Sequence, residues 1–433
     1  MIRQHTGLCL KMTVPVWAMV IIVLLSSMAV LAEPLERRRD QFGTEFGYYI
    51  YPIGGDIPGL GSAQGLGATV LNIADSDADF TSFAIDGDFS ARGGAFLDMH
   101  LIEKKLLLDI GAYDYQVAPL VYRRGIHTGK DDYLLPEAEG QYAIGQLTLS
   151  FSDRRYEGYY RLFVGEQRLL SVRDSQGVSF DSVDTAWHSA LVQSIGLSVD
   201  RTDDRLDPRR GYRHELSLTM PDIEDTYQSD YIGTDYNFSV YTPFRQQDTL
   251  ALNLFYSKAV VTNRASTDYT ELQNAIGLDC ASRPPGPEQT DCYNLEQDFI
   301  SERIAANKYG NATALGGTQR LRSFANGRYH AGQAAFAGAE YRWNLTDEYT
   351  PFDIYVARGI RTGLQLAVFA EAGSVAEHTE DLFAVTRYSF GVGFRAVLSG
   401  VIIRADIANG KEGTEFVLFF NYPWSMFSVD NPA

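Results

Sequence analysis

The chain has 433 residues and a formal net charge of −18, with 37 Lys and Arg against 55 Asp and Glu. This acidity argues against a nucleic-acid binder, whose phosphate contacts need clustered basic residues, and a hydrophobic content of 45% excludes wholesale disorder. The 26 Tyr, 24 Phe and 39 Gly favour an all-β chain, because aromatic side chains suit a pleated sheet and glycine suits its turns.

The N-terminus has the pattern of an export signal. Basic residues precede an apolar run over 14–25, and small residues ending at Ala32 form a cleavage site, with Ala29 as a second candidate. A membrane anchor is the alternative, although the run is shorter than the ~20 residues that a spanning helix needs. We predict a cleaved signal peptide over residues 1–32.

Residues 33–46 include the run Arg37-Arg38-Arg39 and are poor in apolar side chains, so we interpret them as a periplasmic linker. No later apolar stretch reaches the ~20 residues of a membrane-spanning helix. An exported chain of this kind is either soluble outside the inner membrane or a membrane-spanning β-barrel.

Glycines crowd residues 54–67, at the start of the first expected strand. The spacing of Gly59, Gly61 and Gly65 is not that of a dinucleotide fingerprint, and no helical pattern follows it. We therefore assign these glycines to turns and strand starts. In this half of the chain we expect strands near 66–74, 79–88, 93–103, 105–115, 142–152 and 155–166.

In the second half of the chain, apolar and polar residues alternate at period two, which indicates strands. Within 364–373, for example, Leu366 and Val368 lie on one face, whereas Gln365 and Glu371 lie on the other. The same alternation predicts strands over 191–200, 211–220, 231–244, 249–260, 333–345, 387–398, 401–408 and 413–424. In the last of them, the residues expected to face lipid are Phe416, Leu418, Phe420, Tyr422 and Trp424.

A long segment over about 263–332 interrupts this series and shows no strand pattern and no long helical pattern. Cys280 and Cys292 lie in it, among Pro, Asp, Asn and Gln. Because an exported chain reaches an oxidising compartment, we predict a disulfide between them. A metal site is not expected, since neither His nor further Cys lies nearby.

Three features of the alternating region separate two kinds of β protein. Charged residues recur on the polar face of strands about ten residues long, aromatic residues cluster near strand ends, and short turns alternate with long connections. A soluble β-sandwich also alternates, but together these features are typical of a transmembrane antiparallel β-barrel with a charged lumen. We predict such a barrel over residues 47–433.

Three stretches carry a resemblance to a known family: a turn with Pro208 and Gly211, a loop motif of Leu321, Arg322, Ser323 and Phe324, and a strand motif of Phe369, Glu371 and Gly373. Over about 191–424 they resemble the barrel domain of the bacterial surface antigen superfamily, the BamA/TamA type of outer-membrane assembly factor of Gram-negative bacteria. This sequence departs from the family at Ser323, where the family has Gly, and at Glu371, where it has Asp. Trp424 replaces a terminal Phe, and the family's periplasmic repeat domains are not found.

The resemblance implies a barrel of 16 strands whose long loop folds back into the lumen. In that family the arginine of the loop motif pairs with the acid of the strand motif, so Arg322 is expected to bind Glu371. Glu340, on the polar face of the strand after the loop, is the competing partner. A guanidinium can bind a carboxylate through two hydrogen bonds, which would fix the position of the loop.

By the same resemblance, the predicted function is to aid the insertion or export of proteins at the outer membrane, through a weak seam between the first and last strands. The alternative is a passive channel or structural barrel; a lipid hydrolase lacks a motif, and no enzymatic activity and no cofactor are expected. The expected partners are outer-membrane lipid, an unfolded or exported client and a periplasmic adaptor, but no nucleic acid.

Overall fold

The structure is a computed structural model that describes residues 35–42, 45–177, 185–223, 227–245, 247–346, 351–398 and 401–424. The predicted signal peptide, residues 1–32, lies outside the described residues. The chain divides into two units, Met1–Glu36 and Arg37–Ala433, and every described strand and helix belongs to the second. In the described part of the chain, no helix is both long enough and apolar enough to cross a membrane.

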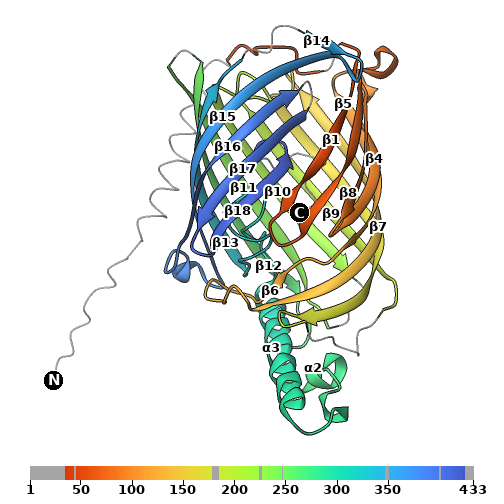
Figure 1. The fold of residues 1–433 in the computed structure, drawn as a ribbon, viewed down its shortest axis with the longest axis vertical. Coiled ribbons are helices and arrows are strands. Elements are labelled where there is room, and N and C mark those ends of the chain that lie inside the picture. The colour runs from red at the N-terminus through yellow and green to blue at the C-terminus, as the bar shows by residue number, and fades with distance from the viewer. Residues whose placement is uncertain are drawn as a thin grey trace, which may run out of the picture. The chain divides into compact units, whose positions relative to one another are not determined.

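The second unit is built on one antiparallel sheet, which wraps into a barrel (Figure 1). In chain order its strands are β1 (Gly47–Ile57), β2 (Gly61–Leu71), β3 (Asp79–Gly87), β4 (Ser90–Ile102), β5 (Leu106–Val117), β6 (Val121–Tyr122), β7 (Tyr133–Phe151), β8 (Tyr156–Asp174), β9 (His188–Asp200), β10 (Gly211–Ile223), β11 (Asp230–Phe244), β12 (Asp248–Asn263), β13 (Gln333–Asn344), β14 (Pro351–Ile354), β15 (Ala357–Ala376), β16 (Arg387–Leu398), β17 (Val401–Gly410) and β18 (Gly413–Phe420).

Successive strands pair with one another, except that β5 pairs directly with β7 and β13 with β15. The short strands β6 and β14 lie in the connections that these pairings bypass. The resemblance implied 16 strands, whereas the described sheet has 18, of which β6 has 2 residues and β14 has 4.

The two faces of the sheet differ in polarity, as the alternation predicted. On β15, Leu366 is 43% and Val368 38% exposed, whereas Gln365 and Glu371 on the opposite face are 2% and 3% exposed. An apolar exterior around a polar, charged interior is the arrangement of a transmembrane barrel. The prediction of an all-β transmembrane antiparallel barrel is therefore confirmed.

The barrel has two unlike ends. At one end the strands are joined by short turns, such as those between β4 and β5 and between β7 and β8; we call this end the short-turn rim. At the other end lie the connections 118–132, 264–332 and 377–386, and we call it the long-connection rim. The long connection 264–332 contains α2 (Tyr269–Ile276), η2 (Cys280–Ser282) and α3 (Pro287–Tyr309); α2 and α3 project beyond the strands (Figure 1). The remaining short helices are η1 (Ile73–Asp75) and η3 (Thr379–Asp381).

The N-terminal strands differ from the prediction in position and length. The glycine-rich stretch 54–67 spans a hairpin of β1 and β2, not one strand start, and Gly59 and Gly61 make its turn with φ of 81° and 99°. Because glycine reaches positive φ without steric cost, the chain can reverse there. Strands β7 and β8 have 19 residues each and are longer than predicted.

The prediction for the last strand is wrong at its end. β18 stops at Phe420, and Tyr422 and Trp424 are 6% and 2% exposed inside the barrel, not facing lipid. Two local features explain the change of direction. Asn421 has a φ of 61°, which interrupts extended backbone, and Pro423 has no N–H for the ladder.

The expectation that 263–332 contains no long helix is also wrong, because α3 has 23 residues. Polar residues lie on most sides of this helix, so its apolar residues form no stripe that periodicity could reveal. Pro287 at its first turn suits a helix start, because the missing N–H has no partner in the helix there.

Candidate functional site

The part of the long connection that follows α3, residues 311–332, packs against the inner wall of the barrel; we call it the loop tip. Leu321, Phe324 and Tyr329 are at most 1% exposed and form an apolar cluster with Phe336 of β13. The residue of the loop motif with positive φ is Leu321, at 53°, and not Ser323. The backbone at position 323 is therefore not in the left-handed region that favours glycine. Serine can stand there in place of the glycine expected from the resemblance.

Arg322 lies at the centre of the loop tip and reaches the barrel wall. Its Nε donates to Glu371 Oε1 and its backbone N–H to Glu371 Oε2, both at 2.9 Å. Its Nη1 donates to Glu340 at 3.0 Å and to Asp406 at 2.9 Å. The guanidinium carbon lies 3.4 Å from the centre of the Phe369 ring. Arg322 thus contacts both acids that the sequence proposed as its partners.

The wall around Arg322 contains three more buried arginines, which the alternation placed on the polar face of their strands but assigned to no contact. Arg342 donates to Glu340 at 2.8 Å, and Arg395 donates to the same carboxylate at 2.9 Å. Arg404 donates to Asp406 at 2.8 Å. We call this group the lumen charge cluster; it consists of Arg322, Arg342, Arg395, Arg404, Glu340, Glu371 and Asp406. Removing one partner from a buried ion pair leaves the other charge uncompensated, so such a cluster fixes the position of the loop tip.

The remaining motif residues pack close to this cluster. The backbone N–H of Ser323 donates to the Ser389 hydroxyl at 3.1 Å. A Cβ at Gly373 would lie 2.8 Å from a methyl carbon of Leu315 and 3.0 Å from one of Leu321. Glycine at position 373 therefore lets the loop tip approach β15 closely.

A second set of contacts holds the loop tip at the long-connection rim. Arg328 donates to Glu412, in the turn between β17 and β18, at 2.8 and 3.0 Å, and to Thr128 at 2.7 Å. The backbone N–H of Gly125 donates to the carbonyl of His330 at 2.9 Å. The connection 118–132 thus lies against the loop tip and binds it on the side away from the short-turn rim.

The turn motif lies at the short-turn rim, between β9 and β10. Gly211 has a φ of 109°, and a Cβ there would lie 2.1 Å from the carbonyl oxygen of Arg201, so the turn requires glycine. Pro208 lies in the same turn, in which Asp204 and Asp207 are 1% exposed. We call residues 200–210 the acidic turn.

The arginines of the predicted linker bind the acidic turn. Arg37 lies 3.3 Å from Asp200, Arg38 lies 3.2 Å from Asp207, and Arg39 donates to Asp204 at 3.1 Å. Phe42, 5% exposed, follows them and packs against His100. We call residues 37–42 the N-terminal strap.

Asp207 also binds the other end of the described chain. Tyr422 donates its hydroxyl hydrogen to Asp207 at 2.6 Å, and the Gln365 amide donates to the same carboxylate oxygen at 3.0 Å. Trp424 follows inside the lumen, where its backbone N–H donates to Gln319 of the loop tip at 3.0 Å. One buried carboxylate thus joins the N-terminal strap to the residues after the last strand.

Asp207 lies in the turn, outside the membrane-spanning strands, and is ionised. Burial alone would raise the pKa of its carboxyl, but Arg209 and Arg38, with hydrogen bonds from Tyr422 and Gln365, hold this pKa well below its usual range. At neutral pH the carboxylate therefore stays charged and keeps its contacts with Arg38 and Tyr422.

The first and last strands meet without a ladder. β1 pairs along its whole length with β2, and with β15 only at Tyr48 and Tyr49, while β18 pairs with β17. No ladder pair between β1 and β18 occurs among the described residues. We call this boundary the seam.

At the seam, β1 overlaps β18. The Tyr51 and Phe420 rings lie 5.9 Å apart, and a Cβ at Gly55 would lie 2.3 Å from that of Leu418. Leu418 and Phe420 share the outer face of β18 with Phe416, which is 45% exposed. β1 therefore covers the outer face of β18 with side chains and does not extend the sheet.

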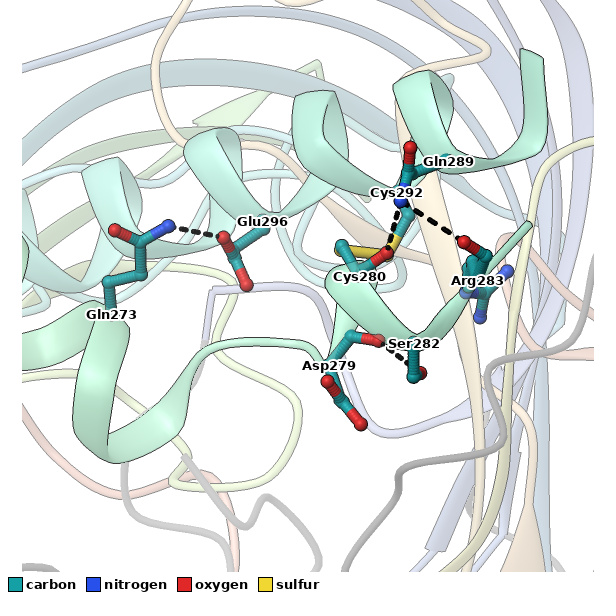
Figure 2. Close-up of a disulfide and its surroundings, with 8 residues drawn as sticks. All are labelled: Gln273, Asp279, Cys280, Ser282, Arg283, Gln289, Cys292 and Glu296. Atoms are coloured by element: carbon teal, nitrogen blue, oxygen red, sulfur yellow. Dashed lines mark hydrogen bonds between the residues drawn. A yellow bond between two sulfur atoms is a disulfide. The ribbon is translucent and has the colours of Figure 1, made fainter. Parts of the chain in front are cut away.

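The predicted disulfide pair lies in the projecting helices. Cys280 of η2 and Cys292 of α3 are bonded to each other (Figure 2). Nearby, Gln289 donates to the carbonyl of Cys280 at 3.2 Å, and Gln273 of α2 donates to Glu296 of α3 at 2.6 Å. We call residues 269–309 the helical hairpin. Among the described residues, no cluster of His, Cys, Asp and Glu is placed to hold a metal ion.

By sequence, no protein-family model and no curated protein matches the chain. Solved structures are similar to 87% of it: BamA from Haemophilus ducreyi lacking POTRA domains 1–3, with 13% identity and a TM-score of 0.46, and CdiB from Acinetobacter baumannii and Escherichia coli, with 11% and 8% identity and TM-scores of 0.48 and 0.49. The chain spans 69% of the BamA structure but only 60% and 61% of the two CdiB structures.

Proposed function

We propose that this chain is an outer-membrane barrel that aids the insertion or export of proteins, and that the seam between β1 and β18 is where a client strand is received. The seam carries the proposal. An edge strand presents unpaired N–H and C=O groups, and these can pair with an incoming strand. In an ordinary closed barrel no such edge is available.

Opening this seam requires the separation of side chains and the loss of one short pairing. β1 covers β18 through Tyr51, Ile53 and Gly55, so moving it outward breaks apolar contacts but no ladder hydrogen bond between these two strands. The movement also breaks the pairing of Tyr48 and Tyr49 with β15. The backbone edge of β18 then becomes accessible from the membrane.

The passive channel, which was the alternative prediction, is not favoured. The loop tip occupies the lumen beside β13, β15 and β16, and its contacts with Thr128 and Glu412 close over it at the long-connection rim. We also propose no catalytic role. The proposal includes the outer membrane as location, and lipid, a client protein and a periplasmic adaptor as partners.

A reversible lock across the seam tests the proposal. Tyr51→Cys and Phe420→Cys place thiols where two rings now meet, in a background with Cys280→Ser and Cys292→Ser. A short bifunctional thiol reagent with a cleavable bond joins them. We expect cells that depend on the locked protein to lose folded outer-membrane or exported proteins, and to regain them when the bond is cleaved.

The matched control joins two strands that are already paired. Phe420 lies opposite Ile403 in the ladder between β18 and β17, so Ile403→Cys with Phe420→Cys puts the same link one strand away. This control should leave client assembly unchanged. The proposed function is wrong if all outer-membrane and exported proteins keep their normal amounts when this protein is depleted. It is also wrong if the seam lock has no effect.

A further inference from the structure

The end of β15 at the short-turn rim continues past its neighbour β16. One edge of β15 pairs with β13 and β14, and on the other edge β16 lies opposite residues 362–373. Beyond that point the start of β1 takes the place of β16, with Tyr48 opposite Arg358 and Tyr49 opposite Ala357. β15 therefore curves over the ends of β16, β17 and β18 and reaches β1 on the far side of the seam (Figure 1).

The two backbones lie very close where β1 meets β15. Besides the two ladder pairs, the N–H of Ile50 donates to the carbonyl of Val356 at 3.0 Å. A Cβ at Gly47 would lie 3.0 Å from the carbonyl oxygen of Arg358, and a Cβ at Gly359 would lie 2.8 Å from a carbonyl oxygen of the residue before β1. Glycine at these two positions thus permits the contact.

A buried side chain closes the same contact. Ile360 is 1% exposed and belongs to an apolar cluster with Tyr49 and Tyr51 of β1, against which Leu398 of β16 and Phe420 of β18 also pack. Ile360 therefore lies where β1 meets the strand ends of the opposite side of the seam.

The hairpin of β14 and the start of β15 has contacts of its own that do not involve β1. The two strands pair with each other, and the N–H of Gly359 donates to the Asp353 carboxylate at 2.7 Å. β15 is also paired with β13 and β16, so this hairpin can keep its place when β1 leaves it. We call residues 351–360 the clasp.

At the long-connection rim, β1 and β2 are held through the turn between them. The N–H of Asn326 in the loop tip donates to the carbonyl of Pro58, and the N–H of Leu120 donates to that of Gly59, both at 2.8 Å. The lumen charge cluster fixes the loop tip, and all 11 residues of β1 are paired with β2. The two strands can therefore swing as one unit about this turn.

We propose that the clasp controls the seam. β1 separates from the clasp before a client strand reaches β18, and the seam opens from the short-turn rim while the β1–β2 turn stays bound. This inference rests on the proposed function, because it assigns what controls the same seam. Short turns lie on the periplasmic side of outer-membrane barrels, so the seam opens first on the side from which a client arrives.

Release of β1 from the clasp is a small step compared with the separation of two ordinary strands. It breaks two ladder pairs, the hydrogen bond of Ile50 and the contacts of Ile360. Separating β17 from β16 would instead break the pairing of all 10 residues of β17. The clasp is therefore the part of the barrel ladder that a few side-chain changes can loosen.

Distances between spin labels measure the seam without any client. Leu66→Cys on β2 and Ile407→Cys on β17 carry the labels at positions that are 61% and 51% exposed, in a background with Cys280→Ser and Cys292→Ser. Ile360→Ala should enlarge, at least about fivefold, the population whose labels are farther apart by about 5 Å, the width of one strand.

A second variant and a matched control accompany this measurement. Gly47→Val places a side chain against the carbonyl of Arg358 and should enlarge the same population. Tyr355→Ala changes a residue that is 97% exposed at the tip of the clasp, and it should leave the label distances unchanged.

A reversible lock connects the clasp to client assembly. Tyr48→Cys and Arg358→Cys, in the same cysteine-free background and joined by a short cleavable thiol reagent, keep β1 on the clasp. Cells that depend on this protein should lose client proteins and regain them after cleavage. The control, Leu366→Cys with Phe394→Cys, joins β15 to β16, with which it is fully paired there, and should have no effect.

The outcomes separate the clasp from the proposed function. The clasp proposal is overturned if neither Ile360→Ala nor Gly47→Val changes the label distances, or if Tyr355→Ala changes them equally. It is also overturned if the lock between residues 48 and 358 is harmless while the lock between residues 51 and 420 stops client assembly. If both locks are harmless but the label distances change as expected, the proposed function fails and control of the seam by the clasp stands.

Discussion

The loop tip and the helical hairpin belong to one connection but are held in opposite ways. In the loop tip, Arg322 and Arg328 are fully buried, and each binds carboxylates outside the loop. In the helical hairpin, all charged side chains except that of Glu296 are exposed or partly exposed, and a disulfide within the hairpin joins η2 to α3. Its base is tied to the barrel, where buried Asn307 binds Ser229, and α3 also contacts the connection 118–132, where the backbone N–H of Arg124 donates to Glu302 at 3.0 Å.

The difference shows that the barrel positions the loop tip, whereas the hairpin maintains its own structure. Charges buried in a wall of low dielectric are strongly coupled to one another, but exposed charges are screened by water and salt. Substitutions in the loop tip should therefore affect the whole barrel, and substitutions in the hairpin should act locally. Four measurements test this division.

The largest effect is expected for Arg322→Ala. This change leaves Glu371, Glu340 and Asp406 short of one buried cation, which should lower the free energy of unfolding by about 3–5 kcal/mol. Urea unfolding, followed by the gel mobility of the folded barrel, measures it. The double variant with Glu371→Ala should lose less than the sum of the two single changes, because the partners are in contact.

Arg303→Ala is the matched control in the hairpin. Arg303 lies 3.2 Å from the side chain of Gln228 at a partly exposed site, so its loss should cost less than about 1 kcal/mol. Equal losses for the variants at 322 and 303 would contradict the division between the two regions.

Arg328→Ala should have the second largest effect. Its partner Glu412 stays partly exposed, at 21% of its side chain, and water can replace part of the lost contact. We expect a loss of about 1.5–3 kcal/mol, as for hydrogen bonds to charged groups. Arg328→Lys keeps the charge but not the planar fork, so it should recover only part of the loss. Full recovery would mean that charge alone holds this side of the loop tip.

Removing the disulfide should act on the hairpin alone. Cys280 and Cys292 are 12 residues apart, and opening such a loop adds conformational freedom only to that segment. The double variant Cys280→Ser/Cys292→Ser should therefore be cut faster by protease within 269–309, while the urea midpoint of the barrel stays unchanged. A shifted midpoint would show that the hairpin supports the barrel after all.

The smallest effect is a pH dependence of the hairpin. Burial raises the pKa of Glu302 in α3, and the backbone N–H of Arg124 and the charges of Arg123 and Arg124 offset this only in part. A raised acid pKa means that the docked hairpin favours the protonated form. Docking should thus be strongest below about pH 4.3, the ordinary pKa of Glu, and should weaken as the pH rises through the raised value.

Hydrogen exchange of α3, corrected for intrinsic rates, measures this trend, and Glu302→Gln should abolish it. Faster corrected exchange at low pH than at neutral pH would reverse the assigned direction.

The facing of the strands could be read from the sequence because it depends on local alternation. Combining that alternation with the motifs of the resembling family predicted that Arg322 binds Glu371, with Glu340 as the competing partner. The same alternation placed Arg395, Arg404 and Asp406 on the polar face, but it cannot say which lumen charges share one cluster. That depends on register across several strands, which no local pattern encodes.

Two other features were out of reach for different physical reasons. The inward course of Tyr422 and Trp424 depends on the positive φ of Asn421 and on Pro423, although the aromatic alternation of the strand continues past them in the sequence. The N-terminal strap pairs arginines and aspartates that lie more than 160 residues apart, and each charge alone looks like a solvated one. Helix α3 lacked an apolar stripe because it projects from the barrel.

The junction at Asp207 has a consequence for folding. Arg38 precedes Asp207 by 169 residues, and Tyr422 follows it by 215. Contacts this distant in the chain carry a large loop-closure cost. Both should therefore form late, after the strands between them have paired, and the completed junction then marks a barrel in which the strap and the residues after the last strand have both arrived.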